Sequence, residues 1–428
     1  MLVEFSVTNF RSILERQTLS MVASSYFKEL EASNTFIPPG QDGEGPHLLR
    51  STVLYGPNAS GKSTLINALQ FVEWQVLNSQ KESQAGDEID VVPFKLMASS
   101  RSTESEFEIA FVEQGVRYEY GFSCNRIRFT EEWLIAYPKG HAQKWFHRVF
   151  DAETEKDVYK FSSLFLGGRQ RQTWAAQTRS NALFLSTAIQ LNNEQLKPAF
   201  DWFKLRLRVV GSVRNFSPNY TMQRCGNDAD RRRVVEFMNS ADLSLDDIQL
   251  KETVFSADSL PQSMPAALRE GILKDMAGKK ILEPRFLRKD INTAEIVEFD
   301  GSEESDGTRA LFAFVGPWLD VIENERVLVV DELDSSLHPL LVHHLVKRLH
   351  YEGTKAQLIF TTHDTTLLSQ KLLRRDQIWF MEKDDKSATR LYPLSDFSPR
   401  DNEAIERGYL NGRYGGIPFL KDLDFYGN

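Results

Sequence analysis

Gly56-Pro57-Asn58-Ala59-Ser60-Gly61-Lys62-Ser63 is the stretch that decides the fold of this 428-residue chain, because it matches G-x-x-x-x-G-K-[ST] in full. An apolar run, Val53-Leu54-Tyr55, precedes it, and a helical pattern of apolar residues follows from about 62 to 78. In a strand–loop–helix unit of this kind, backbone N–H groups and the positive end of the helix point at one phosphate chain. The alternative is a Gly/Ser turn before an amphipathic helix. The full match and both flanks favour a nucleotide-binding site.

The motif assigns a role to each polar group of the loop. Lys62 is expected to reach the β- and γ-phosphates and to assist catalysis, and the Ser63 hydroxyl is expected to bind Mg²⁺. The residues predicted to bind the nucleotide here are Gly56, Asn58, Ala59, Ser60, Gly61, Lys62, Ser63 and Thr64. ATP and Mg²⁺ are therefore the expected cofactors.

Composition and length indicate an ordinary globular protein of two or three domains. The chain is 41% hydrophobic and 26% charged, and it has no apolar run near the roughly 18–20 residues of a membrane helix. The N-terminus lacks a signal-peptide pattern, and Cys124 and Cys225 are typical of incidental thiols, so we expect a cytoplasmic protein without a membrane partner. The net charge of −9 argues against a protein that is basic as a whole and binds nucleic acid, but it does not exclude a local basic surface.

The first two thirds of the chain predict three kinds of structure. Residues 1–24 alternate as two short strands, and a meander of antiparallel strands begins near 106. From about 183 to 280 the apolar spacing is helical, apart from a short strand or loop at 243–250. The serines and prolines of 256–265 predict a loop.

The last third alternates between strand and helix patterns. The predicted strands are 294–299, 327–331, 357–361 and 377–381, and the predicted helices are 306–323, 337–350 and 365–374. Such alternation is typical of a mainly parallel sheet covered by helices. We therefore predict an α/β fold in which the first and last thirds form one core. The predicted domains are residues 1–90 (first part of the core), 91–162 (inserted β-rich segment), 163–290 (helical insert), 291–395 (second part of the core) and 396–428 (tail).

Two acids follow the apolar strand that begins at Val327. Strand ends of this type lie at the sheet edge where α/β proteins bind ligands. Asp331 is expected to hold Mg²⁺, through water, and Glu332 to orient or deprotonate the attacking water. His363 follows the next strand and is a candidate donor to a γ-phosphate. Acids after strands and single histidines are often structural, so the phosphate loop upstream is what favours these roles.

Ser305 and Gly307 open the helix that precedes the acidic strand. A hydroxyl and exposed N–H groups at a helix start form another anion site. The alternative is an ordinary cap, with Ser305 capping a helix that begins at Asp306.

Together these motifs resemble the ATP-binding-cassette (ABC) class of ATPases, in the branch of the chromosome-maintenance and double-strand-break-repair ATPases. Gly56–Ser63 resembles the phosphate loop, Glu304–Thr308 a divergent signature motif, Val327–Glu332 the acidic strand, Leu333–Ser335 the D-loop and His363 the switch histidine. The resemblance implies an ABC-type core in which two subunits enclose two ATPs, with Ser305 and Gly307 capping the nucleotide of the other subunit. It thus implies a homodimer or a higher oligomer. The signature departs from the family pattern, and the glutamine loop has only Gln80 and Gln84 as candidates.

Three further segments resemble the bacterial abortive-infection ATPases of the AbiL/RloA type, which are related to the ATPase part of OLD-family proteins. They are Asn9–Ser12, Asp331–Pro339 and Asn411–Pro418. On the basis of this resemblance, Arg11 of the first segment is predicted to bind the nucleotide. The resemblance implies a sensor or regulator subunit of anti-phage defence that works with a separate effector, such as a nuclease from the same operon. About 45 residues follow the last predicted strand, too few for a nuclease domain.

Two other functions stay open at this point. One is a repair or recombination ATPase that acts directly on nucleic acid. The other is a scaffold that binds ATP as a structural ligand, and Glu332 argues against it because a pure binder has no use for a base.

Overall fold

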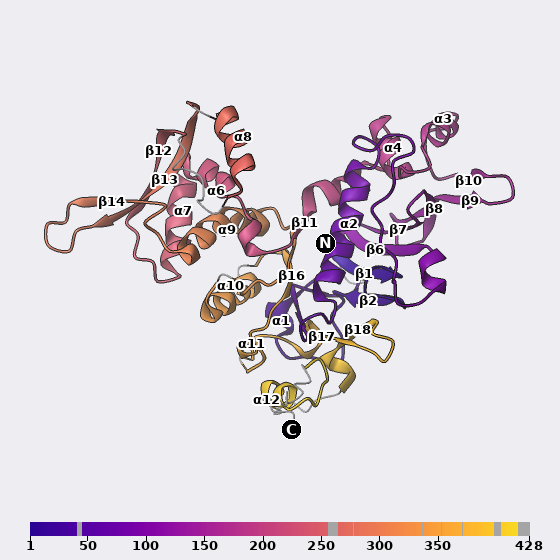
Figure 1. Ribbon diagram of the computed structural model, residues 1–428. Helices are drawn as coiled ribbons and strands as arrows, with labels where there is room; N and C mark the ends of the chain where they lie inside the picture. Colours follow the sequence, from indigo (N-terminus) through magenta and orange to yellow (C-terminus); the bar gives the residue numbers. More distant parts are fainter. Residues whose placement is uncertain are drawn as a thin grey trace, which may run out of the picture. The chain divides into compact units, whose positions relative to one another are not determined.

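The computed structural model describes residues 1–40, 45–255, 264–276, 278–335, 337–351, 353–369, 371–397 and 404–417 (Figure 1). Most of the predicted loop at 256–265, Ser336 of the acidic motif and the tail from Pro418 onward lie outside these residues. The chain forms two compact units. The first unit comprises Met1–Ser212, Val321–Asp334 and His338–Asn428, and the second comprises Val213–Asp320 and Ser335–Leu337.

A six-stranded sheet in the first unit carries the phosphate loop. Its order is β11-β15-β16-β5-β17-β18, and every neighbouring pair is parallel except β17 with β18. The strands are β5 (Ser51–Tyr55), β11 (Leu207–Val210), β15 (Val327–Val330), β16 (Gln357–Thr361), β17 (Ile378–Lys383) and β18 (Thr389–Pro393). Every residue of β5, β15 and β16 is buried, as expected for central strands covered on both faces. The predicted mainly parallel α/β core is confirmed.

The helix after the phosphate loop is α2 (Lys62–Asn78), which has the predicted bounds. Its buried side chains Leu65, Leu69, Val72 and Val76 recur at helical spacing and form one apolar face. The other helices of this unit are α1 (Glu31–Asn34), α3 (Gln170–Gln177), α4 (Phe184–Gln190), α5 (Lys197–Asp201), α10 (Pro339–Tyr351), α11 (Thr366–Ser369) and α12 (Ile405–Leu410). The helix predicted over 365–374 is thus shorter than expected.

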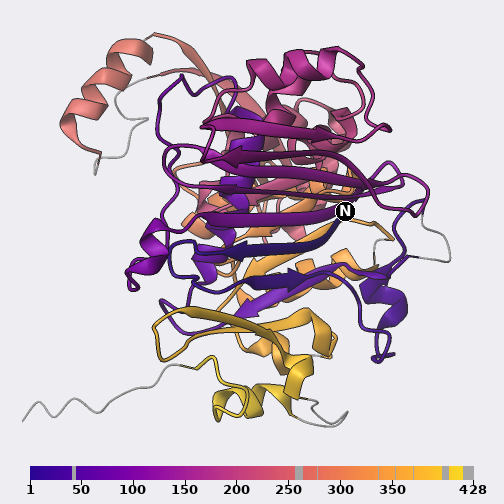
Figure 2. The same cartoon turned by 90° about the vertical axis from the view of Figure 1, so that its right-hand side faces the viewer.

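A seven-stranded antiparallel sheet forms the rest of the first unit, in the order β10-β9-β8-β7-β6-β1-β2 (Figure 2). Its strands are β1 (Leu2–Thr8), β2 (Gln17–Ser20), β6 (Ser105–Glu113), β7 (Val116–Cys124), β8 (Phe129–Tyr137), β9 (Gln143–Asp151) and β10 (Lys156–Phe161). A small two-stranded sheet joins β3 (Thr35–Phe36) to β4 (Leu48–Leu49). The predicted meander is confirmed.

The first strand of the chain belongs to the meander sheet rather than to the parallel sheet. Phe5 of β1 pairs with Ile109 of β6, and Val7 pairs with Phe107. These residues and Leu69 of α2 belong to one hydrophobic cluster. The β-rich segment therefore packs directly on the helix that begins at the phosphate loop.

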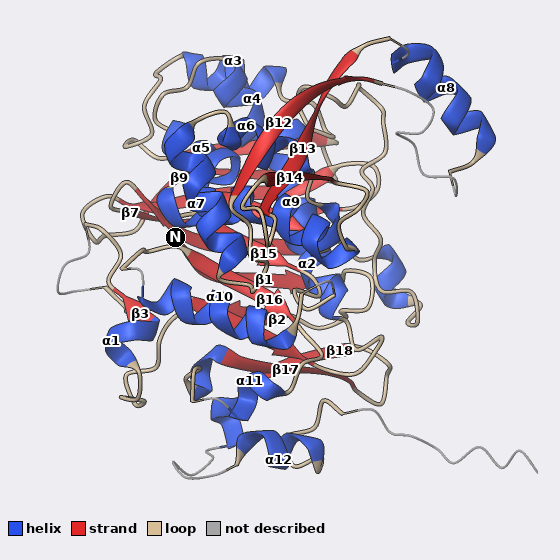
Figure 3. Cartoon of the chain, turned by 90° about the vertical axis from the view of Figure 1, so that its left-hand side faces the viewer, coloured by secondary structure: helices blue, strands red, loops and turns tan. Residues whose placement is uncertain are grey.

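The second unit contains a three-stranded antiparallel sheet, β12-β13-β14, and four helices among its described residues (Figure 3). Its elements are α6 (Pro218–Cys225), α7 (Asp228–Asn239), β12 (Asp247–Val254), α8 (Ala266–Met276), β13 (Lys280–Lys289), β14 (Ile296–Asp300) and α9 (Asp306–Glu323), of which the last three residues belong to the first unit. Asn227 caps α7 by accepting hydrogen bonds from the N–H groups of Ala229 and Asp230.

The prediction that 183–280 is helical is wrong for β11, whereas β12 overlaps the short strand or loop predicted at 243–250 and continues beyond it. The four residues of β11 lie between helical patterns, and their extended form depends on parallel pairing with β15, which is far away in the chain. β12 is stabilised by pairing with β13, a strand that the sequence pattern missed. None of the helices in the described ranges is long and apolar enough to cross a membrane.

Candidate functional site

The phosphate loop turns through left-handed backbone at two positions. Ala59 has φ +63° and Gly61 has φ +111°. A Cβ on Gly61 would collide with the side chain of Thr389, so only glycine fits there. Asn58, Ala59 and Ser63 are exposed, and they leave one side of the loop open to a ligand.

Lys62 is buried and turned back toward its own loop. Its Nζ donates hydrogen bonds to the carbonyl oxygens of Gly56 (2.6 Å) and Pro57 (3.1 Å). Burial lowers the pKa of this ammonium group, and the charges of Asp331, Glu332 and Asp334 partly oppose that shift. The acids that follow β15 are therefore close enough to Lys62 to act on its charge.

The two acids after β15 are held by a threonine of the neighbouring strand. The Thr361 hydroxyl donates to Asp331 Oδ1 (2.6 Å) and accepts from the backbone N–H of Glu332 (2.7 Å). Glu332 has φ +50°, and its side chain is exposed, whereas Asp331 is buried. Asp331 is thus enclosed by the protein at the sheet edge, whereas the side chain of Glu332 is open to solvent.

His363 lies two residues beyond the end of β16. Its backbone N–H donates to Asp334 Oδ2 at 3.2 Å, and its side chain is exposed. Because β16 lies between β5 and β15 and all three are parallel, the loop, the acids and His363 extend from the same sheet edge.

A network of hydroxyl groups supports the loop from the N-terminal segment and from β18. Ser12 Oγ donates to Thr64 Oγ1 (3.0 Å) and lies 2.9 Å from Thr389 Oγ1. Thr389 Oγ1 in turn donates to the carbonyl oxygen of Ser60 at 2.8 Å. Arg11 beside Ser12 is exposed and has φ +50°. The assignment of Arg11 to nucleotide binding stays a prediction, and the sequence analysis missed Ser12 and Thr389 as supports of the loop.

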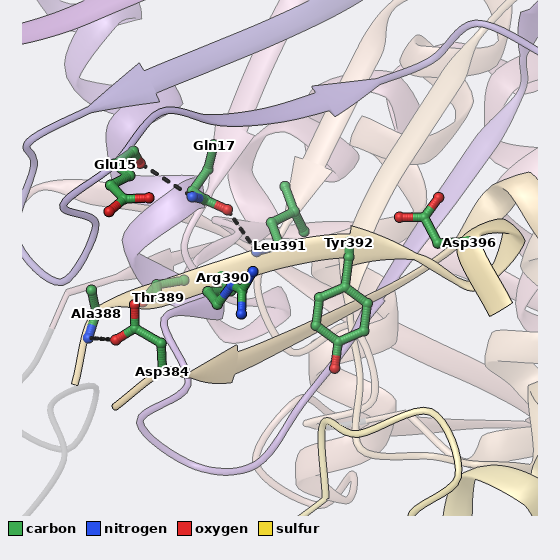
Figure 4. A pocket seen from close by; sticks show the side chains of 9 residues that line it. All are labelled: Glu15, Gln17, Asp384, Ala388, Thr389, Arg390, Leu391, Tyr392 and Asp396. Carbon is green, nitrogen blue, oxygen red and sulfur yellow. Dashed lines mark hydrogen bonds between the residues drawn. The ribbon is translucent and has the colours of Figure 1, made fainter. Parts of the chain in front are cut away.

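A polar pocket of about 300 Å³ adjoins this network and shares Thr389 with it (Figure 4). The side chain of Gln17, from the N-terminal segment, contacts β18: its Oε1 accepts a hydrogen bond from the Leu391 N–H at 2.7 Å. Glu15, Asp384 and Asp396 give the pocket an acidic lining, which does not suit a phosphate group.

Ser305 and Gly307 belong to the second unit. Ser305 Oγ accepts from the Thr308 N–H at 3.1 Å, so Ser305 caps α9 as the structural alternative expected. Both Ser305 and Gly307 are exposed. Gly307 also lines a cavity of about 1100 Å³ that is formed by residues of the second unit.

Neither candidate for the glutamine loop lies near the phosphate loop. Gln80 lies beyond the C-terminal end of α2, whose last residue, Asn78, is about 24 Å along the helix axis from Lys62. Its Oε1 accepts from the Thr187 hydroxyl at 3.4 Å, which is a packing contact. Gln84 lies further still from the loop along the chain.

The donor set at the loop suits Mg²⁺ better than a transition metal. The described residues contain no group of three or more His, Cys, Asp or Glu that would hold a metal by itself. Ser63 and Asp331 instead offer one hydroxyl and one carboxylate, hard oxygen donors of the kind that bind Mg²⁺ together with nucleotide phosphates. The residues present therefore fit a metal that arrives with its nucleotide.

Comparison with known proteins gives one family and a number of similar solved structures. No curated protein matches the chain. The SMC head domain from Thermotoga maritima is 13% identical with a TM-score of 0.39, and the match covers 92% of this chain and 98% of that one. An SmcHead bound to the C-winged helix domain of ScpA is 12% identical with a TM-score of 0.39, over 93% of this chain and 99% of that one.

A family model matches residues 51–369, from the first residue of β5 to the last of α11. The match spans well over half of the sequence, so the chain belongs to the family described as "AAA domain, putative AbiEii toxin, Type IV TA system".

Proposed function

We propose that this chain is an ATPase of the ABC type that converts ATP and water to ADP and phosphate. The observation that supports it best is the common sheet edge from which the phosphate loop, the two acids after β15 and His363 extend, because β5, β16 and β15 are parallel neighbours. A buried lysine in the phosphate loop, together with one buried and one exposed acid at the same sheet edge, is the set of groups that phosphoryl transfer to water requires.

Each residue has a distinct role in this proposal. Lys62 leaves the carbonyls of its own loop and binds the β- and γ-phosphates, while Glu332 orients and deprotonates the attacking water. His363 donates to the γ-phosphate. The remaining nucleotide contacts come from Arg11, Gly56, Asn58, Ala59, Ser60, Gly61, Ser63 and Thr64.

Ser63 and Asp331 are the residues that would hold Mg²⁺. When bound, the metal neutralises charge that develops on the phosphate oxygens. Asp331 is kept in place for this by the Thr361 hydroxyl, and Ser63 by the first turn of α2.

Phosphate release from ATP by the purified chain tests the activity. We expect turnover with Mg²⁺ and none with excess EDTA. Release no faster than that of the Lys62→Ala variant would refute the proposal.

We further propose that two chains share each active site. The sequence carries one phosphate loop and one signature-like helix start, so a two-fold pair would supply two complete sites. Ser305 and Gly307 of one subunit would then cap the nucleotide of the other, and ATP would stabilise the closed pair. The exposure of Ser305 and Gly307 supports this role, because a buried cap has no surface to offer a second subunit.

In the cell, we propose a regulatory ATPase of anti-phage defence in the cytoplasm, coupled to a separate effector. The support is the family, whose description names an AbiEii toxin of a type IV toxin–antitoxin system, together with the motifs given above. The segment at roughly 90–290 is the proposed source of specificity for the partner or trigger, because the predicted nucleotide contacts within one chain lie outside it.

Co-purification with the product of the neighbouring gene, with and without ATP, tests this cellular role. A nucleotide-dependent complex and loss of phage resistance in the Glu332→Gln strain are expected. Stimulation of the ATPase by duplex DNA alone, without any protein partner, would favour a repair enzyme instead.

A further inference from the structure

Thr361 makes three hydrogen bonds to three consecutive residues after β15. Its hydroxyl donates to Asp331 Oδ1 at 2.6 Å and accepts from the Glu332 N–H at 2.7 Å. Its carbonyl oxygen accepts from the Leu333 N–H at 3.1 Å. Thr361 is fully buried, so no water competes for its hydroxyl.

The direction of the two hydroxyl bonds is determined by their partners. The Glu332 backbone nitrogen can only donate, so the hydroxyl must accept from it and direct its own proton to Asp331. That hydrogen bond is charge-assisted and leaves the other carboxylate oxygen, Oδ2, for a further ligand. One hydroxyl therefore orients the carboxylate assigned to the metal.

The same hydroxyl stabilises the backbone that carries the proposed base. Glu332 has φ +50°, a left-handed conformation that costs a residue with a side chain about 1 kcal/mol or more. The hydrogen bond from its N–H to Thr361 helps to offset that cost. Thr361 also pairs in register with Leu54 of β5, so it lies on the strand between the phosphate loop and the acids.

We propose that Thr361 is a positioning residue that orients Asp331 toward the metal and Glu332 toward the attacking water. This inference rests on the proposed ATPase function. Outer partners of metal ligands usually change metal affinity or activity by about 10- to 100-fold when they are removed. The hydrogen bonds of the Thr361 hydroxyl go to Asp331 and Glu332, so its removal should act on the metal and on turnover rather than on nucleotide affinity.

The test compares Thr361→Ser with Thr361→Ala, because these two variants differ only by the hydroxyl group. For Thr361→Ala we expect kcat to fall about 10- to 100-fold, half-maximal activity to need more Mg²⁺, and ATP binding in EDTA to stay unchanged. Thr361→Ser should keep most of the wild-type activity. Thr52→Val is the matched control, because Thr52 is a fully buried threonine of β5 whose hydroxyl donates a hydrogen bond to the sulfur of Met21 and not to the acids after β15.

A second measurement separates this inference from the proposed function. Mn²⁺ binding to the protein with a non-hydrolysable ATP analogue, followed by electron paramagnetic resonance, does not depend on turnover. Weaker Mn²⁺ binding in Thr361→Ala than in Thr361→Ser would support the positioning role even if the wild type hydrolysed no ATP. Equal Mn²⁺ affinity and equal kcat in the two variants would overturn it and leave the ATPase proposal intact.

Discussion

The ammonium group of Lys62 donates a 2.6 Å hydrogen bond to the carbonyl oxygen of Gly56, the first residue of its own loop. A second bond joins it to Pro57, and its pKa is lowered by burial. The phosphate groups of a bound nucleotide must therefore displace the backbone carbonyl groups that now bind Lys62, and not merely water molecules.

Lys62→Ala should remove ATP binding. A lost charge-assisted hydrogen bond costs roughly 1.5–3 kcal/mol, or about a 10- to 100-fold rise in Kd for each phosphate contact. Titration calorimetry measures this effect directly. Lys81→Ala is the control, because Lys81 is an exposed lysine beyond the far end of α2. Equal ATP affinity for the wild type and Lys62→Ala would contradict the assignment.

Glu332→Gln should bind ATP normally and fail to hydrolyse it. The amide keeps the size and exposure of the side chain but cannot accept a proton from water. Loss of a general base typically reduces kcat by about 10²- to 10⁴-fold. Single-turnover assays should find ATP retained on the protein, whereas phosphate release at the wild-type rate would show that another group is the base.

Ser305→Arg should leave ATP binding to a single chain intact but block turnover. The reason is that Ser305 is expected to face the nucleotide of a second subunit, where an arginine side chain would prevent closure. A mixture with Lys62→Ala protein should restore at most one working site per heterodimer. Turnover per chain should also fall on dilution below the dimer constant. Hydrolysis at the wild-type rate by Ser305→Arg, or a turnover per chain that does not change on dilution, would refute the shared site.

Stability should fall in mild acid because of His350. This residue of α10 is buried, its Nε2 lies 2.9 Å from Ser51 Oγ, and burial, with a smaller effect from Arg50, lowers its pKa from 6.5 to about 3. Between these two values the unfolded chain binds a proton that the folded chain does not. The free energy of unfolding therefore decreases as the pH falls through this window, by up to about 2 kcal/mol at pH 5.

Urea unfolding at pH 7 and pH 5 measures the contribution of His350. His350→Leu should lose part of the pH dependence, and His141→Gln, a change at an exposed histidine, should retain it. An unchanged pH slope in His350→Leu would show that other groups cause the acid sensitivity.

Local sequence patterns predicted much of the parallel sheet. The phosphate loop, α2 and the strands at 327 and 357 agree with the structure to within a residue, because loop glycines and unbroken apolar runs leave few other conformations. The helix from 306 to 323 was predicted with its observed bounds as well. The ligand roles of the loop and the acids were also read from residue type and order alone, and they remain predictions.

Contacts between distant segments decided the rest. The four residues of β11 form a strand because pairing with β15 and burial stabilise the extended conformation. No local sequence pattern predicts this pairing. β1 could have paired with either sheet on its alternation alone, and its apolar register with β6 placed it in the meander sheet.

The sequence by itself determined that this protein has a phosphate loop and an acidic strand, since both depend on residues that are neighbours in the chain. Only the tertiary structure decided that Thr361 joins Asp331 to Glu332 and that Thr389 closes over Gly61. These contacts join side chains from separate strands, and their geometry depends on strand order and register. Strand order follows from the packing of the whole sheet, which lies beyond any local pattern.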